Sequence, residues 1–432
     1  MSIFKRIEDS FFSVLLFLCF FSYALSFLTI GVLVSINLWV VLILTILWCL
    51  CKCVAFFLLW KKAKPAKLFH FWKARFGLPN ILLWCGAIFG FLLIWINVFI
   101  SSPSTALSLN YFRKVVFYSC AFLLCPCLSS YKAPKFTYWF LFAGVSLCVA
   151  AGLMVWIFDI GEIYWGNGAS KSLVLNLGNP NILGIVCSIC FLWAAYCTLR
   201  SRQWWWKLIS AGDAIVCFVF VLLSKSRTSL IAVIGALLIF ILLKFVKIRK
   251  DRTRFFVLMT YLFLPLIVFS FYIILIKLIF PDVDVMSAST GGLFGKSWLT
   301  RWTEWTDLAK IFVQHPWFGS YYLATNGTGN SQALNLALDM MTAFGFLSYL
   351  VLIFCYFLML NMQRQNMGGR AVPSLAALSG FLSCLLLGCF EAGIFNSSIY
   401  IFLVYSFLGF VWSPVISNKN LSPAIPYDVY SI

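Results

Sequence analysis

LISAGDAIVCFVFVLLSKSRTSLIAVIGALLIFILLKFV, residues 208–246, contains two apolar runs joined by the short polar stretch Ser224-Lys225-Ser226-Arg227. Each run is long enough to cross a hydrocarbon core of about 30 Å as a helix. The rest of the chain has the same character, since 63% of its 432 residues are hydrophobic and only 10% are charged. An average soluble protein has about 25% charged residues. The sequence therefore predicts an all-α, polytopic integral membrane protein.

Twelve such runs follow one another along the chain, and we predict one membrane-spanning helix for each. They lie at residues 11–31, 37–59, 79–100, 111–129, 137–158, 180–198, 208–224, 229–246, 255–280, 336–360, 372–390 and 399–416. No small-residue cleavage site follows the first run, so we expect it to remain in the protein as a span. Residues 1–432 are thus predicted to form a single membrane domain.

Lysine and arginine are divided unevenly between the two sides that this topology defines. Alternate connections place 23 cations on one side and eight on the other, while Lys277 falls inside a span. The positive-inside rule makes the richer side cytoplasmic, which puts both termini in the cytoplasm. The net charge of +19 is therefore a topology signal that also suits anionic membrane lipids. We expect no nucleic-acid partner.

The cysteines do not form a metal-binding pattern. Most of the 16 lie in or at the ends of apolar runs, where we expect them to act as small apolar residues. Two close groups, Cys49-Cys51-Cys53 and Cys125-Cys127, have no histidine or carboxylate neighbour. We therefore expect neither a metal nor a cofactor.

A long connection at residues 281–335 separates the ninth and tenth runs on the cation-poor, outer side. Its centre alternates apolar and charged residues at helical spacing, which predicts an amphipathic helix that ends at Pro316. The apolar positions are Trp302, Trp305, Leu308, Ala309 and Phe312. Connections of this length are uncommon unless they are functional. We predict a lid over a site at the outer side, with a plain capping loop as the alternative.

Charged residues at the outer ends of the runs are candidates for that site. Arg227 opens the eighth run, Asp339 lies in the first turn of the tenth, and Glu391 follows the eleventh. Charges at membrane depth are costly and commonly face a cavity or a partner. The planar guanidinium of Arg227 suits a phosphate or a carboxylate. For Lys225, snorkelling to the interface is the plainer interpretation.

Another candidate is the helix start Gly178-Asn179-Pro180-Asn181 before the sixth run. Pro180 suits the first helical position and Asn179 suits the N-cap before it. The amides of Asn181 and its neighbours would then point to the outer side, where an anion could bind. A simple capped helix start is the alternative.

Four motifs in the second half of the chain resemble successive landmarks of the O-antigen ligase and O-antigen polymerase superfamily. They are Leu-Gly-Asn-Pro-Asn-Ile-Leu-Gly at 177–184, Ser-Lys-Ser-Arg-Thr-Ser-Leu at 224–230, Arg301 leading Trp305, and His-Pro-Trp-Phe-Gly from His315. A helix with Phe-Gly-Phe-Leu at 344–347 follows them. Their order and the large loop before the tenth run also match the family.

This resemblance implies glycan transfer at the periplasmic face of a bacterial inner membrane. The implied donor is a glycan on undecaprenyl diphosphate, and the implied acceptor is another lipid-linked repeat, the lipid A core or a protein hydroxyl. A chain-length regulator is a further candidate partner. By position in the motifs, Arg227 and Arg301 are the cations expected to stabilise the leaving diphosphate. The candidate substrate-binding residues are Asn179, Asn181, Lys225, Trp305, His315, Asn335 and Glu391.

The chain departs from the ligase pattern at the residue expected to act as the base. Ligases carry a His-Asn pair before the tenth run, where this chain has Leu334-Asn335. The usual acidic residue near Gly345 is also missing, because Ala343 occupies its position. Asp339 lies one helical turn before Ala343 on a similar face, so we predict that it replaces the missing base. The absent histidine favours a polymerase over a ligase.

Two functions of other classes stay open at this point. Twelve helices with cytoplasmic termini also suit a transporter or a flippase for lipid-linked oligosaccharides. Such proteins commonly contain internal repeats, and none is visible here because the single loop at 281–335 breaks any symmetry between halves. A structural subunit of an envelope complex would explain neither Arg227 nor Arg301.

Overall fold

The computed structural model describes the chain in segments that leave several connections out. These segments are residues 3–29, 31–62, 78–101, 109–129, 131–165, 171–245, 267, 295–320, 335–364, 372–388 and 398–411. Almost all of them are helical, as the composition predicted. The described helices are α1 (Ile3–Phe27), α2 (Gly31–Lys62), α4 (Leu78–Ser101), α5 (Leu109–Ser129), α6 (Thr137–Ile157), α7 (Pro180–Arg200), α8 (Trp204–Leu223), α9 (Arg227–Phe245), α11 (Gly295–Gln314), α13 (Leu336–Arg364), α14 (Val372–Gly388) and α15 (Ser398–Val411).

Apart from α11, each of these helices overlaps one of the predicted apolar runs. Seven of them are long and apolar enough to cross a membrane, and α2, α5, α14 and α15 contain shorter apolar stretches. The run predicted at 255–280 lies outside the described residues except for Ile267. The protein is therefore a polytopic, nearly all-helical membrane protein, and the number of twelve spans stays a prediction.

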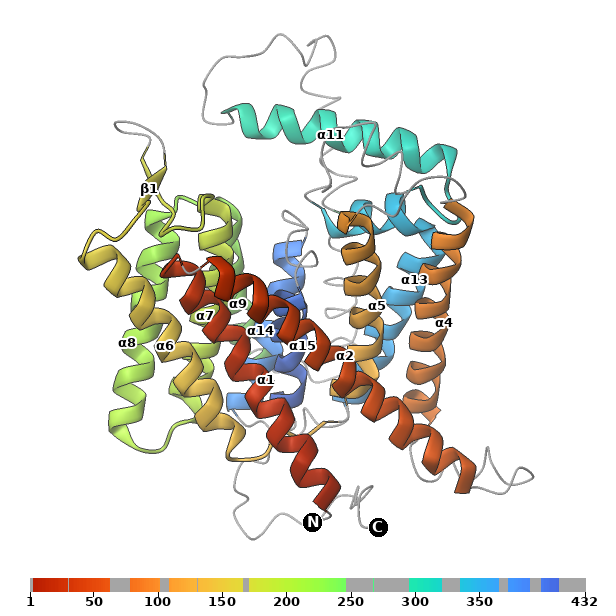
Figure 1. Cartoon of the computed structure of the whole chain (residues 1–432), viewed down its shortest axis with the longest axis horizontal. Coiled ribbons are helices and arrows are strands. Elements are labelled where there is room, and N and C mark those ends of the chain that lie inside the picture. Colours follow the sequence, from red (N-terminus) through yellow and green to blue (C-terminus); the bar gives the residue numbers. More distant parts are fainter. Residues whose placement is uncertain are drawn as a thin grey trace.

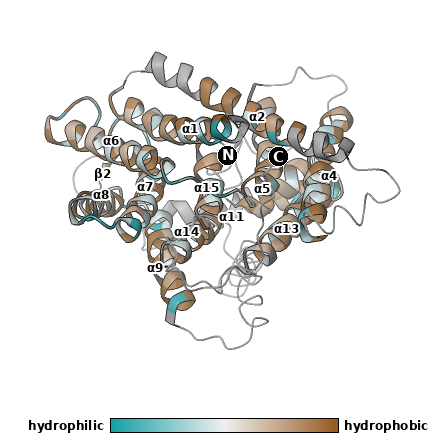
Figure 2. Cartoon of the chain, turned by 90° about the horizontal axis from the view of Figure 1, so that it is seen from below, coloured by the Kyte–Doolittle hydropathy of each residue, from teal (hydrophilic) through white to brown (hydrophobic). Residues whose placement is uncertain are grey.

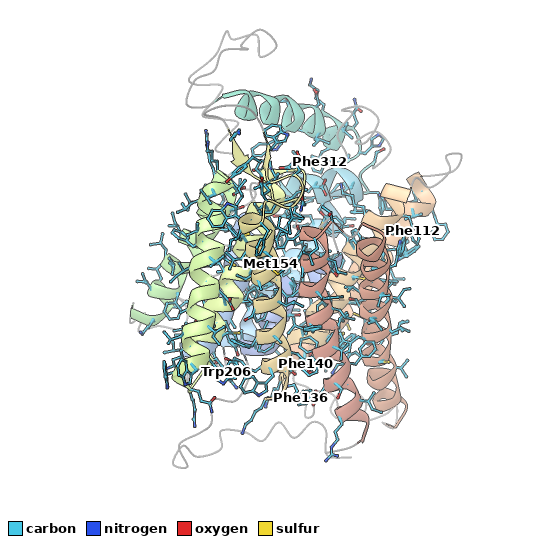
Figure 3. The ribbon with its side chains drawn as sticks, turned by 60° about the vertical axis from the view of Figure 1, so that its left-hand side comes forward. Phe112, Phe136, Phe140, Met154, Trp206 and Phe312 are labelled. Atoms are coloured by element: carbon cyan, nitrogen blue, oxygen red, sulfur yellow. The ribbon has the colours of Figure 1, made fainter. Side chains whose placement is uncertain are left out.

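The helices pack in two groups that meet at α15 and α2. In one group α1 packs on α6, α7 on α8, and α14 on α9; in the other, α4 packs on both α13 and α5. The outward surfaces are apolar, as Figure 2 shows by the prevalence of brown on the helices. Exposed side chains of this kind include Phe112, Phe136, Phe140 and Met154, which are labelled in Figure 3. Such helices, apolar all round, suit a lipid environment.

One end of the bundle is defined by α11, which lies across it in Figure 1. We call this the α11 end; the turn between α8 and α9 and the start of α13 also lie there. α11 covers residues 302–312, where the amphipathic helix was predicted, and begins earlier, at Gly295. It packs against α13 and buries Trp305 and Leu308.

A small hairpin at the α11 end leads the chain from α6 into α7. Its strands β1 (Tyr164–Trp165) and β2 (Ser172–Leu173) pair antiparallel. The Asn176 side chain fixes the hairpin, since its Nδ2 donates to the carbonyls of Phe27 and Ile160 and its Oδ1 accepts from the Glu162 amide. The route of the chain into the helix start at Asn179 is thereby held against α1.

The opposite end is held by polar contacts of α1. Glu8 forms an ion pair with Lys52 of α2, and the Tyr131 hydroxyl donates to Asp9 at 2.9 Å. Ser13 and Thr137 share a hydrogen bond of 2.6 Å that joins α1 to the start of α6. Buried polar groups of this kind are satisfied by one another, as an apolar surrounding requires.

Candidate functional site

The two motifs at 177–184 and 224–230 meet at the α11 end. Gly184 of α7 faces Ser226 and Ser229 so closely that a Cβ atom at this position would clash with both side chains. The Ser188 hydroxyl donates to the Ser229 carbonyl at 3.1 Å, and the hydroxyls of Ser226 and Ser229 are 2.8 Å apart. The glycine and the serines are therefore needed for close packing of α7 on α9.

This packing orders the turn that carries the first two predicted cations. Lys225 adopts the left-handed region with φ 54°, which ends α8 and starts α9 at Arg227. The Ser226 amide donates to the Ser224 hydroxyl, which itself donates to the Val221 carbonyl. The side chains of Lys225 and Arg227 are both exposed. Two exposed cations thus lie two residues apart at one short, hydrogen-bonded turn.

The start of α7 has the predicted cap. The Asn179 Oδ1 accepts a hydrogen bond of 2.8 Å from the Asn181 amide, and Pro180 is the first helical residue. Both α7 and α9 begin at the α11 end (Figure 1). The positive ends of their dipoles there favour an anion. Asn179, Asn181, Lys225 and Arg227 belong to this one packed unit of α7, α8 and α9.

Arg301 lies within α11, but its side chain is outside the described residues. Trp305, one turn further on, is 3% exposed and helps to seat α11. His315 follows the end of α11 with an exposed side chain, and its amide donates back to the Ile311 and Phe312 carbonyls. Glu391 is outside the described residues. The predicted meeting of Arg301 with Arg227 therefore stays a prediction.

The turn after α11 enters a break in α13. Gly345 has φ 85° and ψ 166°, which divides α13 into a short half-helix at 336–344 and a long one from 346. The Phe346 amide donates to the Pro316 carbonyl at 2.8 Å, and the Ser320 amide donates to the Thr342 carbonyl at 2.7 Å. The turn thus supplies partners for backbone groups at the break, which an apolar environment requires.

Gly345 also permits the close approach of that turn. A Cβ atom at 345 would overlap the Trp317 backbone, and one at Gly319 would meet the Gly345 amide. Asn97 of α4 donates from its Nδ2 to the Phe318 carbonyl. The turn that follows the C-terminal end of α11 is therefore held by both α13 and α4.

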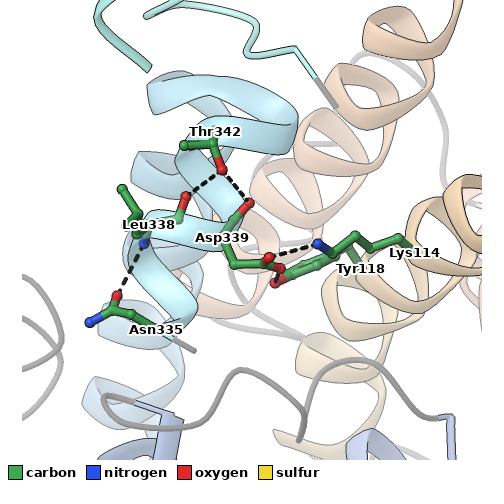
Figure 4. A network of polar contacts seen from close by, with 6 residues as sticks. All are labelled: Lys114, Tyr118, Asn335, Leu338, Asp339 and Thr342. Carbon is green, nitrogen blue, oxygen red and sulfur yellow. Dashed lines mark hydrogen bonds and ion pairs between the residues drawn. The ribbon is translucent and has the colours of Figure 1, made fainter. Parts of the chain in front are cut away.

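Asp339 lies in the half-helix and contacts two side chains of α5, as Figure 4 shows. The Lys114 Nζ is 2.6 Å from the Asp339 Oδ1, and the Tyr118 hydroxyl donates to the Oδ2 at 2.9 Å. The carboxylate is only 3% exposed and its lysine partner 6%. The residue predicted as a base is thus engaged at both oxygens, an arrangement that the sequence reading did not anticipate.

Asn335 precedes Asp339 at the start of the half-helix. Its side chain is fully buried, and its Oδ1 accepts a hydrogen bond of 3.1 Å from the Leu338 amide. The Asp339 amide in turn donates to the Asn335 carbonyl at 2.8 Å. The asparagine that matches the family pattern therefore caps the half-helix, and its position depends on where that half-helix lies.

Lys114 and Tyr118 were not among the predicted site residues, although a signal for them exists. They are four residues apart and so lie on one face of α5, and Lys114 is one of the eight cations on the cation-poor side. The sequence alone gave that cation no partner. In the described part of the chain, no group of three His, Cys, Asp or Glu side chains is arranged to hold a metal ion.

The arrangement defines a polytopic helical membrane protein with paired cations and a broken helix at one end. The family model described as O-antigen ligase matches residues 214–321, which include Lys225, Arg227, Arg301, Trp305 and His315. This match supports the relationship to the O-antigen ligase and O-antigen polymerase superfamily that the motifs predicted. The matched family implies glycan transfer of the ligase or polymerase type on lipid-linked substrates. A comparison with curated proteins found no match.

Proposed function

We propose that the protein is a glycan transferase at the periplasmic face of a bacterial inner membrane, and that it polymerises a surface polysaccharide such as O-antigen. The donor is a glycan on undecaprenyl diphosphate. The observation that carries this proposal is the packing of 177–184 on 224–230, which projects Lys225 and Arg227 from one turn inside the region matched by the family.

On the donor side, the chemistry calls for positive charge beside the leaving group. The acceptor oxygen bonds to the anomeric carbon as the bond from that carbon to the diphosphate oxygen breaks, and undecaprenyl diphosphate leaves. Negative charge grows on the phosphate oxygens, so cations fixed there before the reaction lower the barrier. In the proposal Arg227 and Arg301 provide this charge, and the starts of α7 and α9 add their dipoles.

On the acceptor side, the hydroxyl must lose a proton as it attacks. The sequence predicted Asp339 as the proton acceptor, but its ion pair with Lys114 favours the positioning role that is argued below. Trp305, His315, Asn335 and Glu391 remain proposed contacts for the substrates.

A ligase that passes the glycan to the lipid A core is the second candidate. It is favoured by the description of the matching family model and by Asn335, which keeps the asparagine of the ligase pattern. The missing histidine before Asn335 is the reason that we rank it second.

Alanine at Arg227 or Arg301 should reduce glycan transfer by about 100-fold or more, the usual result of removing a preorganised donor to a developing anion. Lysine at the same positions should recover part of the activity, because it restores charge without the bidentate fork. The measurement is the ladder of surface glycan on a gel, with matched protein amounts in the membrane.

Arg202→Ala is the matched control, since Arg202 is an exposed arginine at the opposite end of α8. A normal ladder in both the Arg227 and the Arg301 variants would defeat the proposal. Loss of long chains with single-repeat attachment preserved would identify a polymerase. Loss of all glycan attachment to the lipid A core, with long chains still made on the carrier lipid, would identify a ligase.

A further inference from the structure

We propose that Lys114 is a positioning residue: its ion pair with Asp339 holds the half-helix 336–344, and with it Asn335 and the turn at 315–320, in the place that the acceptor side needs. The inference rests on the proposed function above. It gives Asp339 the task of holding this segment instead of accepting a proton.

The ion pair lies where it can fix one helix on another. Lys114 and Tyr118 come from adjacent turns of α5, and both reach the same carboxylate, at 2.6 and 2.9 Å. The Lys114 side chain is 6% exposed and that of Asp339 is 3% exposed, so water screens the pair little. A buried charge left alone is costly, so each partner strongly requires the other.

Tyr118 makes a second contact with the same half-helix. Its ring lies edge-on to the ring of Phe344 at a centroid distance of 5.2 Å. Phe344 directly precedes the break at Gly345. Asp339 and Phe344 are one and a half turns apart, so α5 holds the half-helix near its middle and at its end.

The half-helix needs such support because it is short. Isolated helices below about 12 residues are marginal, and this one is separated from the rest of α13 by the non-helical Gly345. One functional candidate and the anchor of α11 depend on it directly. Asn335 is its cap, and the Thr342 carbonyl receives the Ser320 amide from the turn that anchors α11. A shift of the half-helix would therefore displace both.

The position of Asp339 also distinguishes holding from proton transfer. A general base must reach the proton that it removes, within about 3 Å. Here both carboxylate oxygens accept hydrogen bonds from α5, and the residue is 2% exposed. To act as a base, Asp339 would first have to break its ion pair with Lys114, whose ammonium group is also buried.

The experiment is a double-mutant cycle on the full-length protein in membranes. Its members are Lys114→Met, Asp339→Leu, the double variant, and the charge-reversed pair Lys114→Asp with Asp339→Lys. The donor is undecaprenyl-diphosphate-linked oligosaccharide from the host strain, and the acceptor is the same oligosaccharide as an alkyl glycoside, which lacks the diphosphate and cannot act as a donor, so the two can be varied separately. We expect each single variant to lose activity by about tenfold or more, because it leaves one charge buried and unpaired, and the double variant to recover most of it.

Kinetics separate positioning from a general loss of folded protein. In Tyr118→Phe, which keeps the ring on Phe344 but removes the hydroxyl, we expect a higher acceptor KM with an unchanged donor KM. Lys310→Met is the matched control, because Lys310 forms an ion pair with Asp307 that is exposed on α11. Exposed pairs of this kind contribute little, so this variant should behave as the wild type.

Two outcomes would overturn the inference. Folded double variants without activity would show that the Asp339 carboxylate itself is needed, as a base would be. Single variants as active as the wild type would show that the ion pair positions nothing. If the single variants do not accumulate in the membrane, the double and charge-reversed variants decide alone: activity in these folded variants supports the inference, and its absence overturns it. A normal glycan ladder in the Arg227 and Arg301 variants would instead defeat the proposed function. The cycle would still show whether Lys114 and Asp339 depend on each other.

Discussion

Gly345 is the residue on which the described architecture at the α11 end depends most directly. Its φ of 85° lies in the region that glycine adopts without steric cost, and the Trp317 backbone occupies the space where a side chain would begin. The glycine was visible in the sequence as part of Phe344-Gly345-Phe346, but only as a family landmark. Its physical reason, the entry of another segment at the break, required the fold.

Gly345→Ala should therefore destabilise the protein by about 1–3 kcal/mol, through strain at the positive φ and the contact with Trp317. The measurement is the temperature at which the detergent-solubilised protein loses its monodisperse elution peak. Gly212→Ala is the control: Gly212 lies within α8, and a Cβ there would meet nothing within 4 Å. This variant should be neutral or stabilised by about 0.5–1 kcal/mol, because alanine favours a helix. Equal behaviour of the two variants would contradict the account.

At the scale of the elements, the positions of the helices follow from the sequence and their partners do not. The apolar runs of the sequence predicted the positions of all the described helices except α11. The Asn179 cap of α7 was predicted from its motif and is confirmed. The pairing of Lys114 with Asp339 joins positions 225 residues apart, so no local pattern could show it. The same holds for Asn97 and Phe318, which are 221 residues apart.

Asn97→Ala tests how firmly α4 holds the turn that follows the C-terminal end of α11. The substitution leaves the Phe318 carbonyl without this donor, which should cost about 1–3 kcal/mol locally. We expect trypsin to cleave the folded protein faster after Lys310. The digestion is done under native conditions and the fragments are followed on a denaturing gel. Asn80→Ala is the matched control, since Asn80 is also buried in α4 but lies at the opposite end of that helix. Unchanged cleavage in Asn97→Ala would show that α13 alone anchors the turn.

At the scale of the whole molecule, the predicted orientation follows from the charge distribution. The 23 cations on one side and eight on the other predict that the connection at 201–203 is cytoplasmic and the turn at 224–226 periplasmic. The structure places these two connections at opposite ends of α8. The alternation of sides is therefore consistent with the prediction, while the side itself requires an experiment.

Reporter fusions decide the side. Alkaline phosphatase fused after Ser224 should be active, because the enzyme folds only in the periplasm, and green fluorescent protein fused after Gln203 should fluoresce. The reciprocal fusions should both be silent. The inverse result would place Arg227 in the cytoplasm, away from any periplasmic glycan donor, and would reverse the topology that the lysines and arginines predict.

The insertion of the turn at 316–320 into α13 restricts how α11 can move. Pro316 and Ser320 provide backbone partners for Phe346 and Thr342 on the two sides of the break. Withdrawal of the turn would leave these backbone groups without these partners in an apolar surrounding, which costs about 1–3 kcal/mol for each of them. Any motion of α11 that kept these contacts would therefore pivot at its C-terminal end, so the part near Gly295 would travel furthest and the part near Gln314 would stay in place.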